Sequence, residues 1–151
     1  MELTEGMKAP EISLPDDAGN SFKLKALMGK TVVLFFYPKA DTPGCTKEAC
    51  EFRDAGPTFG KKDTVIVGIS PDDNKAQAKF KTKFGLSYTL LCDTDHAVAE
   101  AYGVWKEKSM YGKKYMGIER TTFVIGPDGK LVKIFAKLKP EGHATEVLAA
   151  L

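Results

Sequence analysis

The residue with the most distinctive chemical setting in this sequence is Cys45, which follows Thr42, Pro43 and Gly44. Threonine is favoured at the N-cap of a helix and proline in its first turn, so we expect a helix to begin near Pro43. Cys45 then lies in the first helical turn, where unpaired backbone N–H groups and the positive end of the helix dipole stabilise a thiolate. Since the thiolate is the nucleophilic form of cysteine, the pattern predicts a reactive thiol at a helix start that faces a cleft. A small, inert residue of the core is the alternative for Cys45.

A nearby cation is needed as well, because a helix terminus contributes only about 0.3–2 kcal/mol to the stabilisation of an anion. Arg120 is our candidate, since it stands at the start of another apolar, strand-like run and keeps its charge under all physiological conditions. A surface ion pair without a catalytic role is the alternative for this residue. Glu48 falls in the first turns of the expected helix, where it either complements the helix dipole or orients Arg120.

The elements that position Cys45 are a strand, a helix and a second strand. Two continuous β-prone apolar runs, Thr31–Tyr37 and Thr64–Ser70, predict strands buried on both faces, and Pro38 ends the first. Between them, apolar positions three residues apart predict a helix over Pro43–Phe59. A strand, helix and strand in this order form a βαβ unit with parallel strands, and open α/β sheets place ligands at the carboxyl ends of such strands.

The rest of the chain predicts a mixed sheet with helices on both faces. Two apolar runs flank the turn Gly126–Lys130, so they form an antiparallel hairpin beside a sheet that begins parallel. Near the N-terminus, the turn-rich segment Met7–Ser21 predicts short extended pieces on the surface. The remaining expected elements are a helix over Asp73–Phe84, a strand over Tyr88–Asp93, a helix over Ala97–Tyr102 that ends at Gly103, the hairpin strands Thr121–Ile125 and Leu131–Ala136, and a helix over Glu141–Leu151.

The composition is that of one ordinary globular domain, which we expect to span residues 1–151. The net charge is +2, which provides no long-range attraction to nucleic acid or an anionic membrane. No apolar stretch approaches the ~20 residues that cross a bilayer, and the start of the chain resembles no secretion signal, so we expect a cytoplasmic protein. In that compartment three cysteines indicate catalysis or metal binding rather than a framework of structural disulfides.

The motif around Cys45 resembles that of a known family. Pro38, Thr42 and Cys45 match the Pro-x-x-x-Thr-x-x-Cys motif of the peroxiredoxins, and the flanking YPKADTPGCTKEACEFRD is similar to the bacterioferritin-comigratory (PrxQ) subfamily. The resemblance runs from Gly6 to about the C-terminus. It includes the segments Gly6–Pro10, Val67–Ser70, Leu91–Asp93, Tyr102–Trp105, Arg120–Phe123 and Gly126–Gly129.

This resemblance implies an α/β thioredoxin fold with a peroxiredoxin-type N-terminal extension, and a thiol-dependent peroxidase that reduces hydrogen peroxide and organic hydroperoxides. It implies that Cys45 is the peroxidatic cysteine, that Thr42 and Arg120 are its polar partners, and that Pro38 shields the pocket. Attack on the peroxide leaves a sulfenic acid on Cys45. Cys50 occupies the position that often holds the resolving cysteine, which implies an intramolecular Cys45–Cys50 disulfide.

The same resemblance implies neither a metal nor an organic cofactor, because the oxidant is itself the substrate. Thioredoxin, or a similar dithiol protein, is the expected reductant, and proteins of this type are often monomeric. Cys92 matches no catalytic position of the family, and we interpret it as a structural or incidental thiol. A helix residue without a resolving role is the alternative for Cys50.

Three other functions are compatible with parts of the sequence. A zinc-binding structural module would use four ligands, Cys45, Cys50, Cys92 and His96, although their spacing is loose for a zinc module. A thioredoxin-like thiol–disulfide oxidoreductase would use the same helix start, but its Cys-x-x-Cys motif is not present here. The lysines and tyrosines of residues 106–115 resemble a clamp for single-stranded nucleic acid, but in a chain of near-neutral charge we expect a solvated loop beside the active-site entrance.

Overall fold

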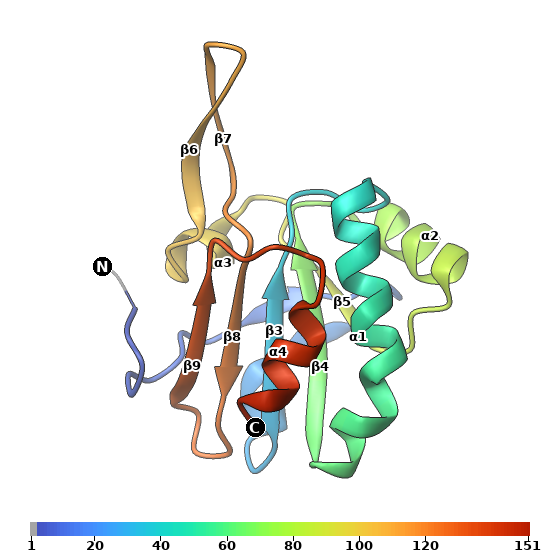
Figure 1. The fold of residues 1–151 in the computed structure, drawn as a ribbon, viewed down its shortest axis with the longest axis vertical. Helices are drawn as coiled ribbons and strands as arrows, with labels where there is room; N and C mark the ends of the chain where they lie inside the picture. The colour runs from blue at the N-terminus through green and yellow to red at the C-terminus, as the bar shows by residue number, and fades with distance from the viewer. Residues whose placement is uncertain (1–2) are drawn as a thin grey trace.

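The structure, a computed structural model, describes residues 3–151 and contains a five-stranded central sheet flanked by helices (Figure 1). Its strands lie in the order β5-β4-β3-β8-β9, and two further pairs, β1–β2 and β6–β7, form small sheets of their own. The elements in chain order are β1 (Ser13–Pro15), β2 (Ser21–Lys23), the 3-10 helix η1 (Leu24–Leu27), β3 (Thr31–Phe36), α1 (Pro43–Lys61), β4 (Thr64–Ser70), α2 (Asn74–Phe84), β5 (Thr89–Cys92), α3 (Ala97–Ala101), β6 (Trp105–Met110), β7 (Lys113–Ile118), β8 (Thr121–Ile125), β9 (Leu131–Ala136) and α4 (His143–Ala149).

The central sheet is mixed, as the sequence predicts. Strand β3 pairs in parallel with β4, with Val33 opposite Ile66, and β4 pairs in parallel with β5. On its other edge β3 pairs antiparallel with β8, which forms the expected hairpin with β9. The βαβ unit β3–α1–β4 is therefore confirmed, and α1 begins at the end of the sheet where β3 and β4 finish (Figure 1).

Alternate residues of β3 contribute to two hydrophobic cores, one on each face of the sheet. Val33 and Phe35 pack in one core with side chains of α1, α2 and α4. Val32 and Leu34 pack in the other core with side chains of α3 and the N-terminal segment. Helices thus cover both faces, as expected, and Figure 1 shows α1 and α4 crossing in front of the sheet.

The segment before β3 is more deeply buried than its turn-rich sequence predicts. Strands β1 and β2 pair antiparallel, with Leu14 opposite Phe22. Ile12, Ala9 and Leu24 are buried in the core that also holds α3. The prediction of surface pieces over Met7–Ser21 is therefore wrong for Ala9 and Ile12, whose apolar side chains are too widely spaced along the chain to produce a periodic signal. These side chains anchor the N-terminal segment to the central sheet.

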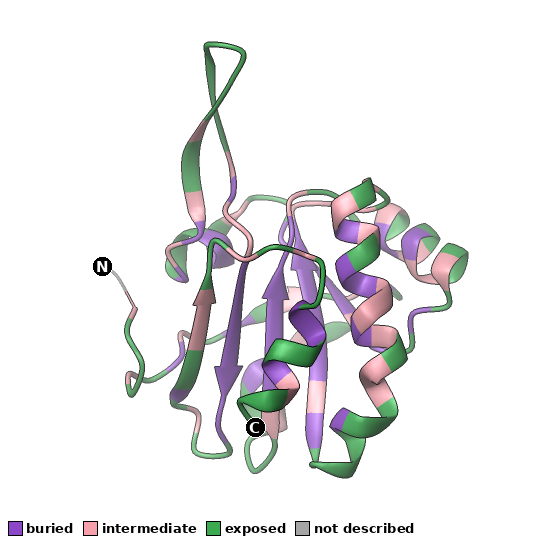
Figure 2. Cartoon of the chain, in the orientation of Figure 1, coloured by how far each residue is buried: buried purple, intermediate pink, exposed green. Residues whose placement is uncertain are grey.

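Residues 105–118 form a β-hairpin, not the solvated loop that their polar sequence predicts. Strands β6 and β7 pair antiparallel, with Lys108 opposite Tyr115. The β6–β7 hairpin projects from the end of the molecule where α1 begins (Figure 1), and most of its residues are exposed (Figure 2). Its strands contact mainly one another, so they need no apolar face toward the core, and the sequence carries no strand signal there.

All four α-helices differ from the expected bounds at one or both ends: α1 extends to Lys61 and α3 ends at Ala101, whereas local capping decides the start of α2. Helix α2 begins at Asn74, since the Asp73 carboxylate accepts a hydrogen bond from the Ala76 N–H at 2.8 Å and makes Asp73 the N-cap. Helix α4 is shorter than expected at both ends, and Gly142, with φ of +77°, precedes it in the left-handed region. None of the helices within residues 3–151 combines the length and the apolar character that crossing a bilayer requires.

Candidate active site

Cys45 is the third residue of α1 and lies just beyond the carboxyl end of β3, as the sequence predicts. Thr42 is the N-cap residue, and its carbonyl accepts a hydrogen bond from the Thr46 N–H at 2.8 Å. The N–H groups of the first turn have no acceptor inside the helix, so they are available to an anion. The Cys45 side chain is only 1% exposed and packs in the same core as Phe35, so the prediction that it faces an open cleft is wrong.

Arg120 lies beside Cys45 at the start of α1. It precedes β8, whose antiparallel register with β3 places Thr121 opposite Phe36 and so brings Arg120 to the start of α1. Arg120 Nη2 donates a hydrogen bond to Cys45 Sγ at 3.2 Å, and Nη1 donates to Glu48 Oε1 at 3.2 Å. The guanidinium therefore places a permanent positive charge and a hydrogen-bond donor against the sulfur.

Glu48 contacts the other part of the guanidinium. It lies about one helical turn after Cys45 and is 1% exposed. Burial raises the pKa of the Glu48 carboxyl to about 7, although the Arg120 charge acts in the opposite direction. Oε1 accepts from Arg120, whereas Oε2 has no hydrogen-bond partner within residues 3–151. Of the two interpretations of Glu48, this geometry favours the one in which it orients Arg120.

The raised pKa of Glu48 makes the stability of the fold depend on pH. Between the ordinary pKa of 4.5 and the folded value of about 7, the folded state holds the Glu48 proton more tightly than the unfolded state does, so stability falls as this group ionises. We expect Glu48→Gln to remove that loss. Relative to the wild type, the variant should gain unfolding free energy as pH rises through this window, on the order of 1–3 kcal/mol.

Urea unfolding of both reduced proteins across this pH range measures the difference. Comparing the two also removes the contribution of His143, whose pKa burial lowers and whose titration makes stability rise with pH in both proteins. A difference between the two unfolding free energies that stays constant with pH would show that Glu48 does not ionise in this window.

Gly44 is a site residue that the sequence analysis did not identify. A Cβ atom at this position would lie 2.8 Å from Arg120 Nη2 and 3.6 Å from Pro140 Cγ. The absence of a side chain therefore allows the guanidinium to reach Cys45 across the start of α1. No local pattern signals this requirement, because Arg120 and the loop after β9 are both distant along the chain.

The loop between β3 and α1 holds the other two expected site residues. The Thr42 hydroxyl donates to the Lys39 carbonyl at 2.8 Å, not to the cysteine sulfur, and makes no capping bond to the helix. Its oxygen keeps lone pairs that can accept a hydrogen bond from a peroxide. The Ala40 N–H donates to Asp72 Oδ2 at 2.8 Å, which ties this loop to the one after β4. Pro38 is partly buried, two residues beyond the end of β3.

Cys50 lies on the same helix as Cys45, is partly exposed and carries a free thiol. Five residues along an ideal α-helix separate two Cα atoms by about 8.7 Å, whereas a disulfide needs about 4.4–6.8 Å. The structure thus brings Cys50 near Cys45 along the helix, but it does not bring the two within bonding reach. A disulfide between them requires α1 to unwind locally.

Cys92 is separate from this group. It ends β5, is buried, and donates its thiol hydrogen to the Asp16 carbonyl at 3.7 Å. Burial, reinforced by nearby aspartates, raises the pKa of Cys92 to about 11, so this thiol stays protonated at neutral pH. This agrees with the interpretation of Cys92 as a structural or incidental thiol.

The residues of the zinc hypothesis do not converge in space. No group of three or more histidine, cysteine, aspartate or glutamate side chains in the described part of the chain is arranged to hold a metal ion. His96 stacks on the Trp105 ring with a centroid distance of 4.0 Å and bonds to Glu100. It therefore has partners of its own, away from Cys45.

Comparisons with known proteins agree with this fold and this arrangement. The AhpC/TSA family model matches residues 6–134. The chain is 48% identical over 151 residues to peroxiredoxin Bcp of Bacillus subtilis, covering all of this chain and 96% of that protein. It is 50% identical over 151 residues to the putative peroxiredoxin bcp of Coxiella burnetii, with both chains covered completely. A mutant of Xanthomonas campestris peroxiredoxin Q is 40% identical, with a TM-score of 0.91 and 97% of each chain covered.

The chain belongs to the AhpC/TSA family, and it is a peroxiredoxin, a thiol-dependent peroxidase with the thioredoxin fold. Its type is that of the bacterioferritin-comigratory (PrxQ) proteins, as the motif around Cys45 predicts.

Proposed function

We propose that Cys45 is the peroxidatic cysteine, activated by Arg120 and resolved by Cys50. The observation that carries this proposal is the hydrogen bond from Arg120 Nη2 to Cys45 Sγ, with Glu48 on the other part of the guanidinium. A fixed cation and unpaired N–H groups then surround one sulfur, which is the arrangement that a thiolate nucleophile needs. Organic hydroperoxides are proposed as substrates beside hydrogen peroxide, since a related Xanthomonas campestris protein is described as having alkyl peroxide reduction activity.

The first step of this mechanism is a nucleophilic displacement on oxygen. The Cys45 thiolate attacks the terminal oxygen of a hydroperoxide, an S–O bond forms, and the O–O bond breaks with its electron pair on the leaving oxygen. The products are a sulfenic acid on Cys45 and an alkoxide or hydroxide, which takes up a proton. Arg120 and the first N–H groups of α1 stabilise the charge that develops on the leaving oxygen. Because Cys45 is buried and the Arg120 side chain is 20% exposed, the peroxide reaches the sulfur past the guanidinium.

The sulfenic acid is then resolved within the chain. The Cys50 thiolate attacks Sγ of the Cys45 sulfenic acid, and the S–O bond breaks as the disulfide forms. The sulfenic oxygen takes up the proton that the Cys50 thiol lost and leaves as water. Because an intact α1 holds the two Cα atoms too far apart, part of the helix between them unwinds. Helix ends open readily, and the cost is that of a few backbone hydrogen bonds, about 1 kcal/mol each.

A dithiol protein of the thioredoxin type completes the cycle. It reduces the Cys45–Cys50 disulfide by thiol–disulfide exchange and returns both cysteines to thiols. We also propose that the chain acts in the cytoplasm as a monomer with one domain over residues 1–151, without a metal or an organic cofactor. All the reacting groups in this scheme come from one chain and its two substrates, the hydroperoxide and the dithiol protein.

A thioredoxin-like thiol–disulfide oxidoreductase is the alternative function. That chemistry requires a second cysteine three residues after Cys45, and this position holds the buried Glu48. Peroxide consumption with a thioredoxin system, set against the reduction of insulin disulfides by this protein, distinguishes the two functions. We expect peroxide consumption without insulin reduction, and the opposite result would favour the alternative.

The resolving step predicts that the oxidised protein is locally unfolded. The backbone amides of about residues 42 to 53 should lose protection from hydrogen exchange after treatment with peroxide, because the disulfide is incompatible with a regular α1. Cys50→Ser is the control, since it cannot form the bond and should keep the helix protected. Equal protection of this segment in both redox states, with a Cys45–Cys50 disulfide identified by mass spectrometry, would contradict the unwinding.

A further inference from the structure

The β6–β7 hairpin exposes an unusual share of the apolar surface. Seven large hydrophobic side chains within residues 3–151 are exposed, and four of them belong to this hairpin: Met110, Tyr111, Tyr115 and Met116. The hairpin projects away from the central sheet (Figure 1), and an isolated two-stranded hairpin is only marginally stable in water. Exposed apolar patches often mark interaction sites, and tyrosine and methionine are enriched in protein–protein interfaces.

The tip of the hairpin carries a large side chain in a conformation that disfavours it. Tyr111 and Gly112 connect the two strands, and both have positive φ, +52° and +77°, as in a type I′ turn. Glycine, asparagine and aspartate adopt this conformation readily, whereas it strains a bulky residue. The Tyr111 side chain is 98% exposed, so packing within the chain does not offset the strain.

The hairpin is also strongly cationic. Residues 105–118 contain four lysines and one glutamate, a net charge of +3, whereas the whole chain carries +2. At its base, Lys106, Lys108 and Lys137 line a single hollow of about 350 Å³, together with two glutamates. A surface with this charge attracts a partner of negative charge and disfavours a cationic one.

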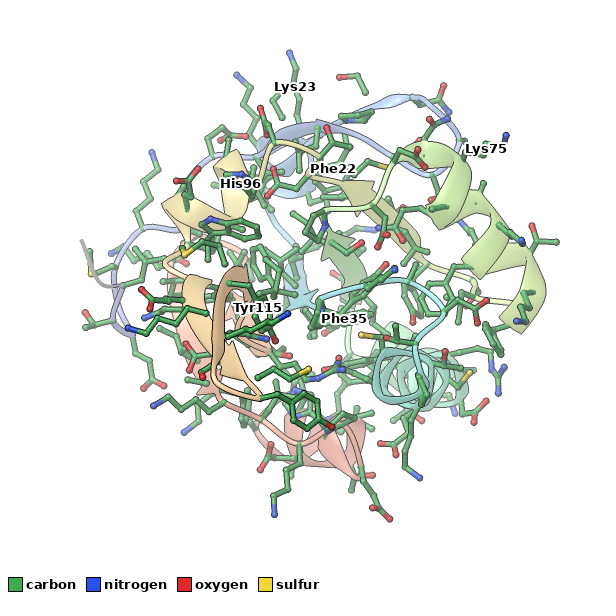
Figure 3. All side chains as sticks on the ribbon, turned by 90° about the horizontal axis from the view of Figure 1, so that it is seen from above. Phe22, Lys23, Phe35, Lys75, His96 and Tyr115 are labelled. Atoms are coloured by element: carbon green, nitrogen blue, oxygen red, sulfur yellow. The ribbon has the colours of Figure 1, made fainter. Side chains whose placement is uncertain are left out.

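This surface adjoins the Cys45 site. Arg120 follows β7 by two residues. Burial lowers the pKa of Lys108, and the positive charge of Arg120 lowers it further, so the base of the hairpin lies close to the guanidinium that contacts Cys45. Figure 3, viewed onto this end of the molecule, shows Tyr115 on the hairpin and Lys75 of α2 well away from it. A protein bound to the hairpin is therefore within reach of the start of α1.

We propose that the β6–β7 hairpin is the docking site for an acidic dithiol reductase, which its tip, residues 110–114, contacts directly. The inference rests on the proposed function, because a reductase is needed only if Cys45 and Cys50 form a disulfide. One reductase thiolate attacks a sulfur of that disulfide, which forms a mixed disulfide and releases the other cysteine as a thiolate. The second reductase thiolate then attacks the reductase sulfur of the mixed disulfide and releases the remaining cysteine. Two electrons and two protons pass to Cys45 and Cys50, and the reductase leaves as a disulfide. The hairpin holds this partner beside the segment of α1 that unwinds.

Two variants test the docking surface without altering the catalytic groups. Lys113→Glu combined with Lys114→Glu reverses the charge near the tip, and Tyr111→Asn removes the ring while it relieves the strained turn. With a bacterial thioredoxin of net negative charge as the probe, we expect kcat/KM for disulfide reduction to fall about tenfold in the first variant and about fivefold in the second. Reduction by dithiothreitol and the rate of peroxide attack should be unchanged in both.

Lys75→Glu combined with Lys79→Glu on α2 is the matched control, because it makes the same change in net charge on a distant exposed surface. It should keep its thioredoxin rate within about twofold, since exposed charges beyond about 10 Å are screened. Tyr111→Asn should melt no lower than the wild type, so that a slower rate in that variant reflects lost contact and not unfolding.

Unchanged thioredoxin rates in both hairpin variants, with normal reduction by dithiothreitol, would overturn the proposal. Equal losses in the α2 control would also overturn it, because the effect would then come from the net charge of the whole protein. Binding of single-stranded DNA that the Lys113→Glu/Lys114→Glu variant loses, without any change toward thioredoxin, would assign the hairpin to a nucleic acid instead. Absence of any disulfide that dithiothreitol reduces would overturn the proposed function, and the docking proposal with it.

Discussion

Replacing Cys45 by serine should abolish peroxidase activity, with a fall in the peroxide consumption rate of at least about a thousandfold. A serine hydroxyl is almost fully protonated at neutral pH and is a much weaker nucleophile than a thiolate. The Arg120 Nη2 donor that contacts Cys45 Sγ would then face a neutral group and stabilise no anion. A coupled assay with thioredoxin, thioredoxin reductase and a hydroperoxide measures the change.

Cys92→Ser is the matched control for this substitution. A serine at this position keeps a hydrogen donor for the Asp16 carbonyl, and the buried Cys92 thiol is protonated in the wild type, so activity should stay within about twofold. Activity of Cys45→Ser within about tenfold of the wild type would contradict the assignment. It would move the nucleophile to Cys50 or Cys92.

Substituting lysine for Arg120 should slow peroxide attack at least about tenfold, a loss of about 1.4 kcal/mol in the transition state, although the charge is kept. The planar guanidinium donates through Nη1 to Glu48 and through Nη2 to Cys45 at the same time. A lysine ammonium is a mobile point charge and does not reproduce this pair of bonds. Stopped-flow measurement of the reaction between reduced protein and hydrogen peroxide gives the rate constant.

Arg53→Lys provides the comparison, because Arg53 is the other arginine of the chain and is itself a residue of α1. Its guanidinium bonds to Asp54 and to the Phe84 carbonyl, away from Cys45, so this variant should react at the wild-type rate. An Arg120→Lys protein that reacts as fast as the wild type would leave Arg120 without a catalytic role.

The elements that could be predicted from the sequence are those whose signals are local. Strands β3 and β4 are continuous apolar runs, and β8 and β9 flank a proline–glycine turn, so composition and turn residues place them. Thr42 and Pro43 place the start of α1 for the same reason. Because a strand end and a helix start fix the position of Cys45, the backbone around this cysteine was predictable.

Features that depend on contacts between distant segments were not predictable in this way. Gly44 is required by the approach of Arg120, and Cys45 is buried because that same side chain and the sheet enclose it. The Thr42 hydroxyl turns to the Lys39 carbonyl in the loop rather than to the sulfur, which no spacing rule indicates. The β6–β7 hairpin escaped prediction because its strands contact mainly each other and leave no apolar period in the sequence.

The central claim, that Cys45 is the residue that reacts with peroxide, is tested most directly by trapping its sulfenic acid. In Cys50→Ser the resolving step is blocked, so a stoichiometric amount of hydroperoxide in the presence of dimedone should give an adduct, and mass spectrometry should locate it on Cys45 alone. Cys92, buried and with its pKa raised to about 11, should remain an unmodified thiol. A dimedone adduct on Cys92, with Cys45 unmodified, would contradict the account.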